Sequence, residues 1–149
     1  MFNIALYQPD IPQNTGAIIR LCSCFDVTLE IIEPCGFYLN DARLKRIAMD
    51  YLDESKIIKY KSYEDFLSKK KNSRIILMTT KAKKKYFDFN FKSKDTILLG
   101  RESAGVPNNV HEDSYERLKI PLKNNKRSLN ISITAAITLS EALRQNLSL

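Results

Sequence analysis

Three short, widely separated segments hold most of the side chains in this chain that could act together chemically. Asn14–Arg20 places an Asn-x-Gly turn sequence at the mouth of a predicted helix and an arginine one turn into that helix. Gly100–Pro107 is a glycine-containing loop with a glutamate, and Ser128–Ser132 supplies hydroxyl and amide groups. Each segment alone is a weak signal, because such residues often serve only to shape turns. Their joint presence, in this order, is what makes them informative.

Arg20 stands out by its position in the first of these segments. On a helical wheel it lies outside the apolar arc, together with Ser23. It follows Gly16 by one turn, so its guanidinium can reach back toward the loop around Asn14. The alternative is an ordinary solvated surface arginine. The residues expected in the buried arc of this helix are Ala17, Ile18, Leu21, Cys22, Cys24 and Phe25.

Strand-like and helix-like runs alternate along the chain that must position these segments. This alternation is typical of an α/β domain with a mostly parallel sheet and helices on both faces. In such sheets ligands bind beyond the carboxyl ends of the strands. The expected ends at Met78–Thr79, Leu99–Gly100 and Ile120–Leu122 could therefore ring a small polar ligand. Strands are expected over residues 3–6, 28–32, 56–60, 74–79, 96–99 and 117–120, and helices over 14–25, 40–51, 63–70 and 131–146.

The last predicted helix differs from the others because apolar and small residues surround most of it from Ile131 to Leu143. A helix of this kind must be covered on several sides. A second subunit would provide that cover, and the alternative is a helix in the centre of the core.

The bulk composition favours a polyanionic partner. The chain has 149 residues, of which 44% are hydrophobic and 28% charged, as is ordinary for a globular domain. Its net charge is +7 and its isoelectric point about 9.3, which is common among nucleic-acid-binding proteins. The alternative is a lysine-rich surface that is merely solvated.

Basic side chains gather near the expected strand ends and on one helix. A cationic rim around a loop-lined pocket would attract phosphates. The Lys69–Lys71 run is better explained as a solvated helix end, where cations also suit the helix dipole. The candidate RNA-binding residues are Arg43, Arg46, Lys81, Lys83, Lys126 and Arg127.

Several other chemistries lack their sequence patterns. Neither G-x-G-x-x-G after the first strand nor G-x-x-x-x-G-K-[ST] occurs. With His111 as the only histidine and no G-x-S-x-G, a Ser-His-Asp hydrolase is hard to build, and we expect no metal site. Cys22, Cys24 and Cys35 fit reduced core residues of a cytosolic protein. No apolar run approaches the roughly 20 residues that span a bilayer, so we expect a cytoplasmic protein without membrane association.

Taken together, the segments resemble the SPOUT superfamily of RNA methyltransferases, in its SpoU (TrmH-like) branch. Asn14–Arg20 matches the first motif, Gly100–Pro107 the second, and Ile120–Pro121 with Ser128–Ser132 the third. The resemblance runs nearly end to end. Within the branch the chain looks most like the minimal single-domain group (TrmL, also called YibK). Further counterparts of that group are Tyr7–Asn14, Ile32–Pro34, Gly36–Phe37, Arg43–Arg46 and Asp50–Tyr51.

The resemblance implies a single SPOUT methyltransferase domain over residues 1–149, with a C-terminal trefoil knot and no appended RNA-binding domain. It implies S-adenosylmethionine as methyl donor and a homodimer, formed through the N-terminal and C-terminal helices, whose active site uses both subunits. The implied reaction is methyl transfer to a ribose 2′-hydroxyl of tRNA. In the TrmL group the target is the wobble nucleotide, cytidine or modified uridine, of certain leucine tRNAs.

Carried over residue by residue, the resemblance also implies roles. Arg20 would be catalytic, supported by Asn14, Glu102 and Asn130. Whether Arg20 takes a proton or stabilises the developing negative charge stays open, because arginine normally keeps its proton. The implied cofactor contacts are Met78, Thr79, Gly100, Glu102, Ile120, Leu122, Ser128, Leu129 and Asn130.

The chain departs from its relatives at three positions. Leu52 stands where a histidine is frequent, Ile133 where an asparagine is frequent, and Arg101 where a proline is common. The first two changes concern substrate contacts and dimer packing, so another tRNA position or rRNA is an alternative target. An alternative of a different class is a basic RNA-binding protein without catalytic activity.

Overall fold

In the computed structural model, which describes residues 1–53, 56–124 and 126–146, seven strands form one sheet in the order β3-β2-β1-β6-β4-β7-β5. All of its strand pairings are parallel. The order reverses between β1 and β6, and in open α/β sheets ligands bind beyond the carboxyl ends of the strands. The strands are β1 (Asn3–Tyr7), β2 (Thr28–Ile32), β3 (Ile57–Tyr60), β4 (Ile75–Met78), β5 (Lys84–Lys85), β6 (Thr96–Leu99) and β7 (Glu116–Lys119).

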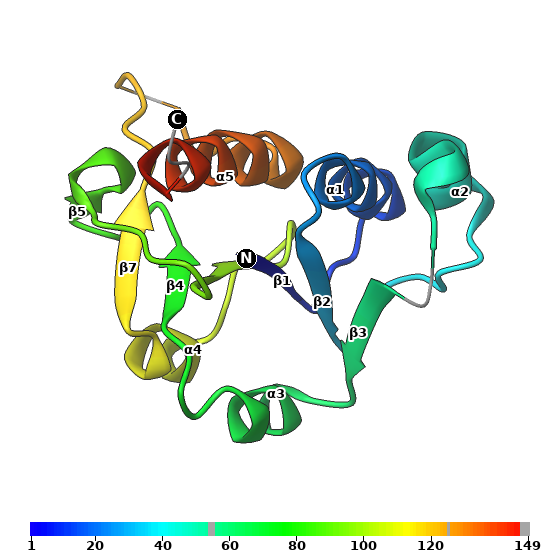
Figure 1. The fold of residues 1–149 in the computed structure, drawn as a ribbon, viewed down its shortest axis with the longest axis horizontal. Coiled ribbons are helices and arrows are strands. Elements are labelled where there is room, and N and C mark those ends of the chain that lie inside the picture. The colour runs from blue at the N-terminus through cyan, green and yellow to red at the C-terminus, as the bar shows by residue number, and fades with distance from the viewer. Residues whose placement is uncertain (54–55, 125, 147–149) are drawn as a thin grey trace.

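Helices cover both faces of this sheet (Figure 1). One face carries α1 (Pro12–Cys24), α2 (Ala42–Ala48) and α5 (Ile131–Asn146), and the other carries α3 (Tyr63–Lys69) and α4 (Asn108–Asp113). Each face has its own apolar cluster, one against α1 and α5 and one against α3 and α4. The expected α/β architecture is confirmed.

Local sequence explains how the elements begin and which strands lie in the middle. Pro12 opens α1 at a position where the missing backbone N–H costs nothing. The Asp41 carboxylate accepts from Arg43 N at 2.8 Å and caps α2, and Ser62 Oγ accepts from Asp65 N at 3.2 Å and caps α3. β4 and β6 are buried at every position because helices cover both of their faces.

Several element bounds differ from the expectation. The helix expected from residue 14 begins at Pro12, and the helix expected over 40–51 is α2 followed by a short 3-10 helix, η1 (Met49–Tyr51). β5, the 3-10 helix η3 (Tyr86–Asp88) and α4 were not expected at all. They are only two to six residues long, so they carry no hydrophobic period.

The predicted buried arc of α1 is partly wrong. Cys24 is exposed and Phe25, just beyond the last helical residue, is 54% exposed, whereas Ile19 is buried. The reason is that α1 packs against both the sheet and α2, so the covered face is wider and turned toward Gly16. A Cβ on Gly16 would lie 2.7 Å from Leu44 O, which shows how close the two helices come. All three cysteines are free, with Cys22 buried and Cys35 partly buried.

The prediction that Lys69–Lys71 is a solvated helix end is wrong for its middle residue. Lys70 is 7% exposed, and its Nζ lies 2.5 Å from Glu30 Oε1 and 3.1 Å from Thr96 Oγ1. The Tyr60 hydroxyl also donates to Glu30 Oε1, at 3.1 Å. The lysine side chain therefore runs from the end of α3 beneath the sheet to a buried carboxylate on β2.

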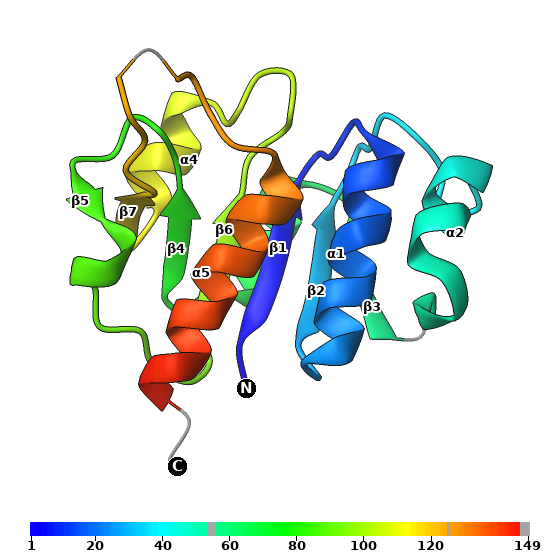
Figure 2. The same ribbon diagram turned by 90° about the horizontal axis from the view of Figure 1, so that it is seen from above.

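The helix α5 is only partly covered by the rest of its own chain. Ala135, Thr138, Leu139 and Ala142 are buried against the sheet and its neighbours, whereas Ile133 is 49% exposed. The helix α5 lies beside α1 on the same face of the sheet (Figure 2). No helix in the described part of the chain is long and apolar enough to cross a membrane.

Candidate active site

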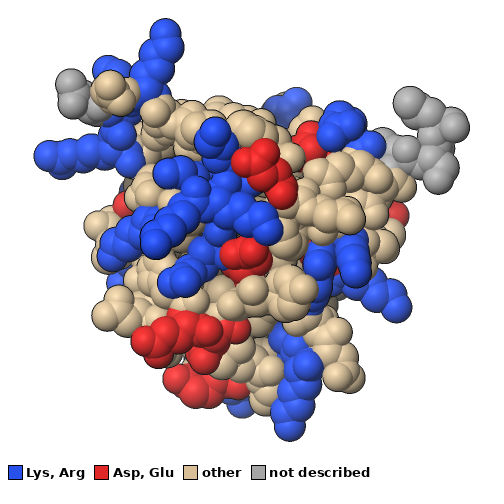
Figure 3. All heavy atoms as spheres, turned by 90° about the vertical axis from the view of Figure 1, so that its left-hand side faces the viewer, with Lys and Arg blue, Asp and Glu red and all other residues tan. Residues whose placement is uncertain are grey.

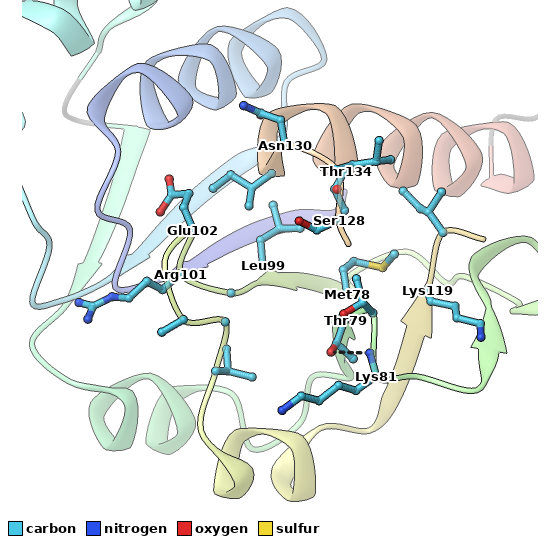
Figure 4. Close-up of a pocket in the computed structure, with 18 of the residues that line it drawn as sticks. Met78, Thr79, Lys81, Leu99, Arg101, Glu102, Lys119, Ser128, Asn130 and Thr134 are labelled. Carbon is cyan, nitrogen blue, oxygen red and sulfur yellow. Dashed lines mark hydrogen bonds between the residues drawn. The ribbon is translucent and has the colours of Figure 1, made fainter. Parts of the chain in front are cut away.

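A cavity of about 490 Å³ opens at the carboxyl ends of β4, β6 and β7, bordered by the N-terminal end of α5 (Figure 4). This is where an open parallel sheet is expected to bind a ligand, and the size suits a small molecule. All nine residues that the family resemblance assigned to the cofactor line it: Met78, Thr79, Gly100, Glu102, Ile120, Leu122, Ser128, Leu129 and Asn130.

Hydrogen bonds connect the three segments that the sequence singled out. Asn130 Nδ2 donates to Asn14 Oδ1 at 2.8 Å, and Asn14 Nδ2 donates to Glu102 Oε1 at 3.3 Å. Asn14 thus joins Glu102, which lies 88 positions further along the chain, to Asn130, which lies 116 positions further. Asn130 Oδ1 accepts from Ser132 N at 2.8 Å, so this side chain also caps the start of α5.

The loop after β1 is fastened to the loop after β6. Asp10 N donates to Glu102 Oε2 at 2.9 Å, and the Asp10 carboxylate accepts a hydrogen bond from the Ser103 hydroxyl. Arg101 Nε donates to Gln8 O at 2.9 Å, and Gln8 has a positive φ of 44°. Arg101 therefore holds the strained turn that leads toward Asn14.

These contacts separate the acidities of two neighbouring carboxyl groups. Burial raises the pKa of Glu102, and the adjacent Asp10 carboxylate raises it further. The pKa of Asp10 is lowered, chiefly by its side-chain hydrogen bond with Glu102. Glu102 is therefore the member of the pair that holds a proton more readily.

The loop between β6 and α4 needs both of its glycines. Arg101 N donates to Gly105 O at 3.0 Å and Gly105 N donates to Arg101 O at 2.8 Å, which closes a tight loop. Gly105 has a φ of 66°, and a Cβ on Gly100 would lie 3.0 Å from Gly105 Cα. A side chain at either position would distort the wall of the cavity.

Arg20 does not line the cavity. Its Nη1 lies 3.5 Å from Met49 Sδ, and its guanidinium lies 5.3 Å from the centre of the Tyr51 ring. The contacts of this exposed side chain are thus with η1. The sequence had instead suggested that it reaches back toward the loop around Asn14. Packing of α1 against α2 brings η1 beside Arg20.

The candidate RNA-binding residues fall into two groups. Lys81 lines the cavity, and exposed Lys83, Lys126 and Arg127 lie on nearby loops. Arg43 and Arg46 are exposed on α2, on the far side of α1 from α5 (Figure 1), and do not join the cavity. Arg43 Nη2 lies 2.8 Å from Asp41 Oδ2, and its hydrogen bonds lower the pKa of Asp41 to about 2.

Other lining residues were not expected. Among them is His111, which is almost fully buried. Its pKa is lowered, mainly by this burial and to a lesser extent by the positive charges of Lys81 and Arg117. Lys119, at the end of β7, also lines the cavity. Only the tertiary packing of α4 brings His111 here, so no local pattern could have identified it. Within the described ranges, no group of three or more His, Cys, Asp or Glu side chains is placed to hold a metal ion.

The sequence matches the model of the SpoU rRNA Methylase family over residues 1–140. The chain belongs to this family. A tRNA (cytidine(34)-2′-O)-methyltransferase of Beijerinckia indica subsp. indica is 47% identical over 144 residues, which are 95% of this chain and 90% of that protein.

Solved structures share the fold of this chain. One, described as "Structural insights into the 2-OH methylation of C/U34 on tRNA", has a TM-score of 0.93 and 32% identity, and covers 97% of this chain and 95% of that one. An AdoMet-bound rRNA methyltransferase of Sinorhizobium meliloti shares the fold at a TM-score of 0.87 and 24% identity, over 99% of this chain and 57% of that one.

Proposed function

We propose that this SpoU-family protein transfers the methyl group of S-adenosylmethionine to the ribose 2′-hydroxyl of tRNA nucleotide 34, in leucine tRNAs. The observation that carries the proposal is the hydrogen-bonded chain Asn130–Asn14–Glu102, which unites the three motif segments beside one cavity. The relative that is 47% identical is a tRNA (cytidine(34)-2′-O)-methyltransferase, which favours this target over rRNA.

The cavity has the features that a nucleoside-containing cofactor needs. Met78, Ile120 and Leu122 offer apolar walls, and the strand ends around them offer backbone N–H and C=O groups. Gly100 allows the loop that forms this wall to close tightly, because a Cβ there would lie 3.0 Å from Gly105 Cα. We therefore assign the nine cofactor residues predicted from the family to this wall. When bound, S-adenosylmethionine supplies a methyl group on a positively charged sulfur and leaves as S-adenosylhomocysteine.

The residues around the cavity have distinct roles in this proposal. Asn14 fixes Glu102 and Asn130 relative to each other, so that the wall is preorganised before substrate binds. Arg20 acts on the ribose 2′-hydroxyl, either by taking its proton or by stabilising the negative charge that develops on it. The second role requires no change in the usual protonation of arginine.

A homodimer would explain why Arg20 lies outside the cavity of its own subunit. The apolar side chains of Phe25, at 54% exposure, and Ile133, at 49%, leave the α1 and α5 layer incompletely covered. Pairing of this layer with a second copy would cover them and could bring Arg20 of one subunit to the cavity of the other. The proposal includes this dimer, a trefoil knot in the C-terminal segment and a cytoplasmic location.

Two binding measurements test the proposal at its first step. Calorimetry with S-adenosylmethionine should show binding and calorimetry with NAD should not, since the chain lacks a dinucleotide-binding glycine motif. No binding of the methyl donor would overturn the proposal. Binding of tRNA and donor without any methyl transfer would instead favour a basic RNA-binding protein.

A further inference from the structure

The outer edge of the sheet carries a group of cations, most of which have no role yet in the proposed reaction. Lys85 on β5 lies directly opposite Lys119 on β7 in the parallel ladder. Side chains alternate along a strand, so Arg117 shares a sheet face with Lys119. Lys81 follows β4 and contributes to the positive charge felt by His111, as does Arg117. We name Lys81, Lys85, Arg117 and Lys119 the edge cation cluster.

The members of this cluster have no close ion-pair partner within the described part of the chain, although the charge of Arg117 is felt by the neighbouring Glu116. None of its four members forms an ion pair there. Lys84 behaves differently, because it points to the other face of β5 and its Nζ lies 3.2 Å from Glu116 Oε2. Like charges opposite each other across two strands destabilise a sheet. The edge therefore holds a repulsion that a bound polyanion would relieve.

The cluster continues the rim of the cavity. Lys81 and Lys119 line the cavity, whereas Lys85 and Arg117 are exposed beyond it. Figure 4 shows Lys81 and Lys119 where the loop after β4 meets the end of β7. Figure 3, which faces this edge, shows Lys and Arg side chains gathered over it. A single anionic chain that reaches the mouth of the cavity could thus continue onto the edge.

An exposed aromatic ring lies beside the cations. Phe87 in η3 is 48% exposed, and Lys85 Nζ lies 5.6 Å from its ring centre. Unstacked bases in single-stranded RNA stack on such rings while lysines bind the phosphates. This combination favours RNA over other polyanions.

We propose that the edge cation cluster binds the ribose-phosphate backbone of the tRNA next to the nucleotide that is presented at the mouth of the cavity, with Phe87 as a stacking surface for a neighbouring base. This inference rests on the proposed function, because it takes tRNA as the substrate. It assigns Lys85, Arg117 and Phe87, which lie outside the cavity and outside the motif segments, to the RNA interface.

The test compares two double variants of the full-length protein. Lys85→Gln/Arg117→Gln removes two charges from the cluster, and Lys59→Gln/Lys61→Gln removes two from exposed positions at the opposite edge of the sheet. Binding of fluorescently labelled leucine tRNA is measured by anisotropy across a salt series. For two lost phosphate contacts, the plot of log K against log salt should become shallower by about 1.4–1.8. The control should keep the wild-type slope.

Other outcomes would overturn the inference. An unchanged slope in the cluster variant means that these cations do not contact phosphate. An equal change in both double variants means a general charge effect. Weaker binding of S-adenosylmethionine with an unchanged slope means that the cluster serves the cofactor. If circular dichroism shows that the double variant does not fold, Lys85→Gln and Arg117→Gln are measured singly. Each should make the slope shallower by about half as much as the double variant.

The wild-type protein separates this inference from the proposed function. If it binds neither leucine tRNA nor S-adenosylmethionine, the proposed function fails. If it binds both and the cluster variant matches it, only the inference about the edge fails. Phe87→Ala should weaken binding of tRNA without changing the salt slope, because stacking releases no counterions. An affinity equal to that of the wild type would remove Phe87 from the interface.

Discussion

Arg20 is the residue on which the proposed chemistry depends most. Its side chain is exposed, and in the described part of the chain its hydrogen bond and its ring contact are both with side chains of η1. Loss of Arg20 should therefore leave the cavity wall intact. Arg20→Ala should lower methyl transfer by at least about 10²–10³-fold, the usual cost of losing one donor that stabilises transition-state charge. Affinity for S-adenosylmethionine, measured by calorimetry, should stay close to that of the wild type. Near wild-type turnover would contradict both roles considered for Arg20.

Asp10 tunes the acidity of Glu102, and this effect can be measured at a single group. Asp10→Asn removes a neighbour that raises the pKa of Glu102, so that pKa should fall. Carbon-13 NMR titration of the Glu102 carboxyl group measures the change, with Glu33→Gln as a control on a carboxylate outside this contact. An unchanged or higher pKa of Glu102 would contradict the assigned contact.

The same shift has a consequence for stability. The raised pKa means that the contribution of Glu102 to stability is fully present below its usual value of 4.5 and is lost as pH rises through the raised pKa. Asp10→Asn should lessen this loss on the alkaline side of 4.5, as followed by denaturant unfolding at several pH values.

At the scale of elements, the buried pair of Lys70 and Glu30 joins the end of α3 to β2. The two side chains are 7% and 2% exposed. Lys70→Met should destabilise the protein by about 3–5 kcal/mol, because it leaves a buried carboxylate without its cation. The double variant Lys70→Met/Glu30→Leu should recover most of this loss, since an apolar pair avoids desolvation of charges. Denaturant unfolding of the three proteins tests this, and a cost below about 1 kcal/mol for the single variant would contradict the described burial.

The elements also show how far sequence reasoning reaches. Ile75–Met78 and Thr96–Leu99 were predictable as strands because burial on both faces demands a continuous apolar run. Lys84–Lys85 forms a strand only because β7 lies beside it, and Lys70 is buried only because Glu30 lies beneath α3. Neither partner is close in sequence, so no local pattern could predict the strand at Lys84–Lys85 or the burial of Lys70.

The candidate site follows the same division. The residues of the cavity wall could be predicted, because the family motifs specify them and all nine line the cavity. Sequence reasoning could not predict the position of His111, because it depends on how α4 packs. It also could not predict the contacts of Arg20 with Met49 and Tyr51, because they depend on how α2 packs. The role of Arg101 in holding Gln8 was hidden for a similar reason, since the partner lies 93 residues away.

For the whole molecule, the proposed dimer predicts complementation between two inactive variants. Arg20→Ala and Asn130→Ala would each disable a different part of a site built from both subunits. Mixed dimers would then contain one intact site, so an equal mixture that exchanges subunits should regain about a quarter of wild-type activity. Methyl transfer by the mixture, with sedimentation to confirm dimers, measures this. Dimers that show no recovery would mean that Arg20 serves its own subunit.

The most direct test of the account is to identify where the protein places a methyl group. Total tRNA from cells that lack the gene, which keeps its other modifications, is incubated with purified protein and methyl-labelled S-adenosylmethionine. Nuclease fragments of the tRNA are then analysed by mass spectrometry. The account predicts one labelled ribose 2′-O-methyl group at nucleotide 34 of leucine tRNAs and none with Arg20→Ala. Label at another nucleotide, on a base or not at all would contradict it.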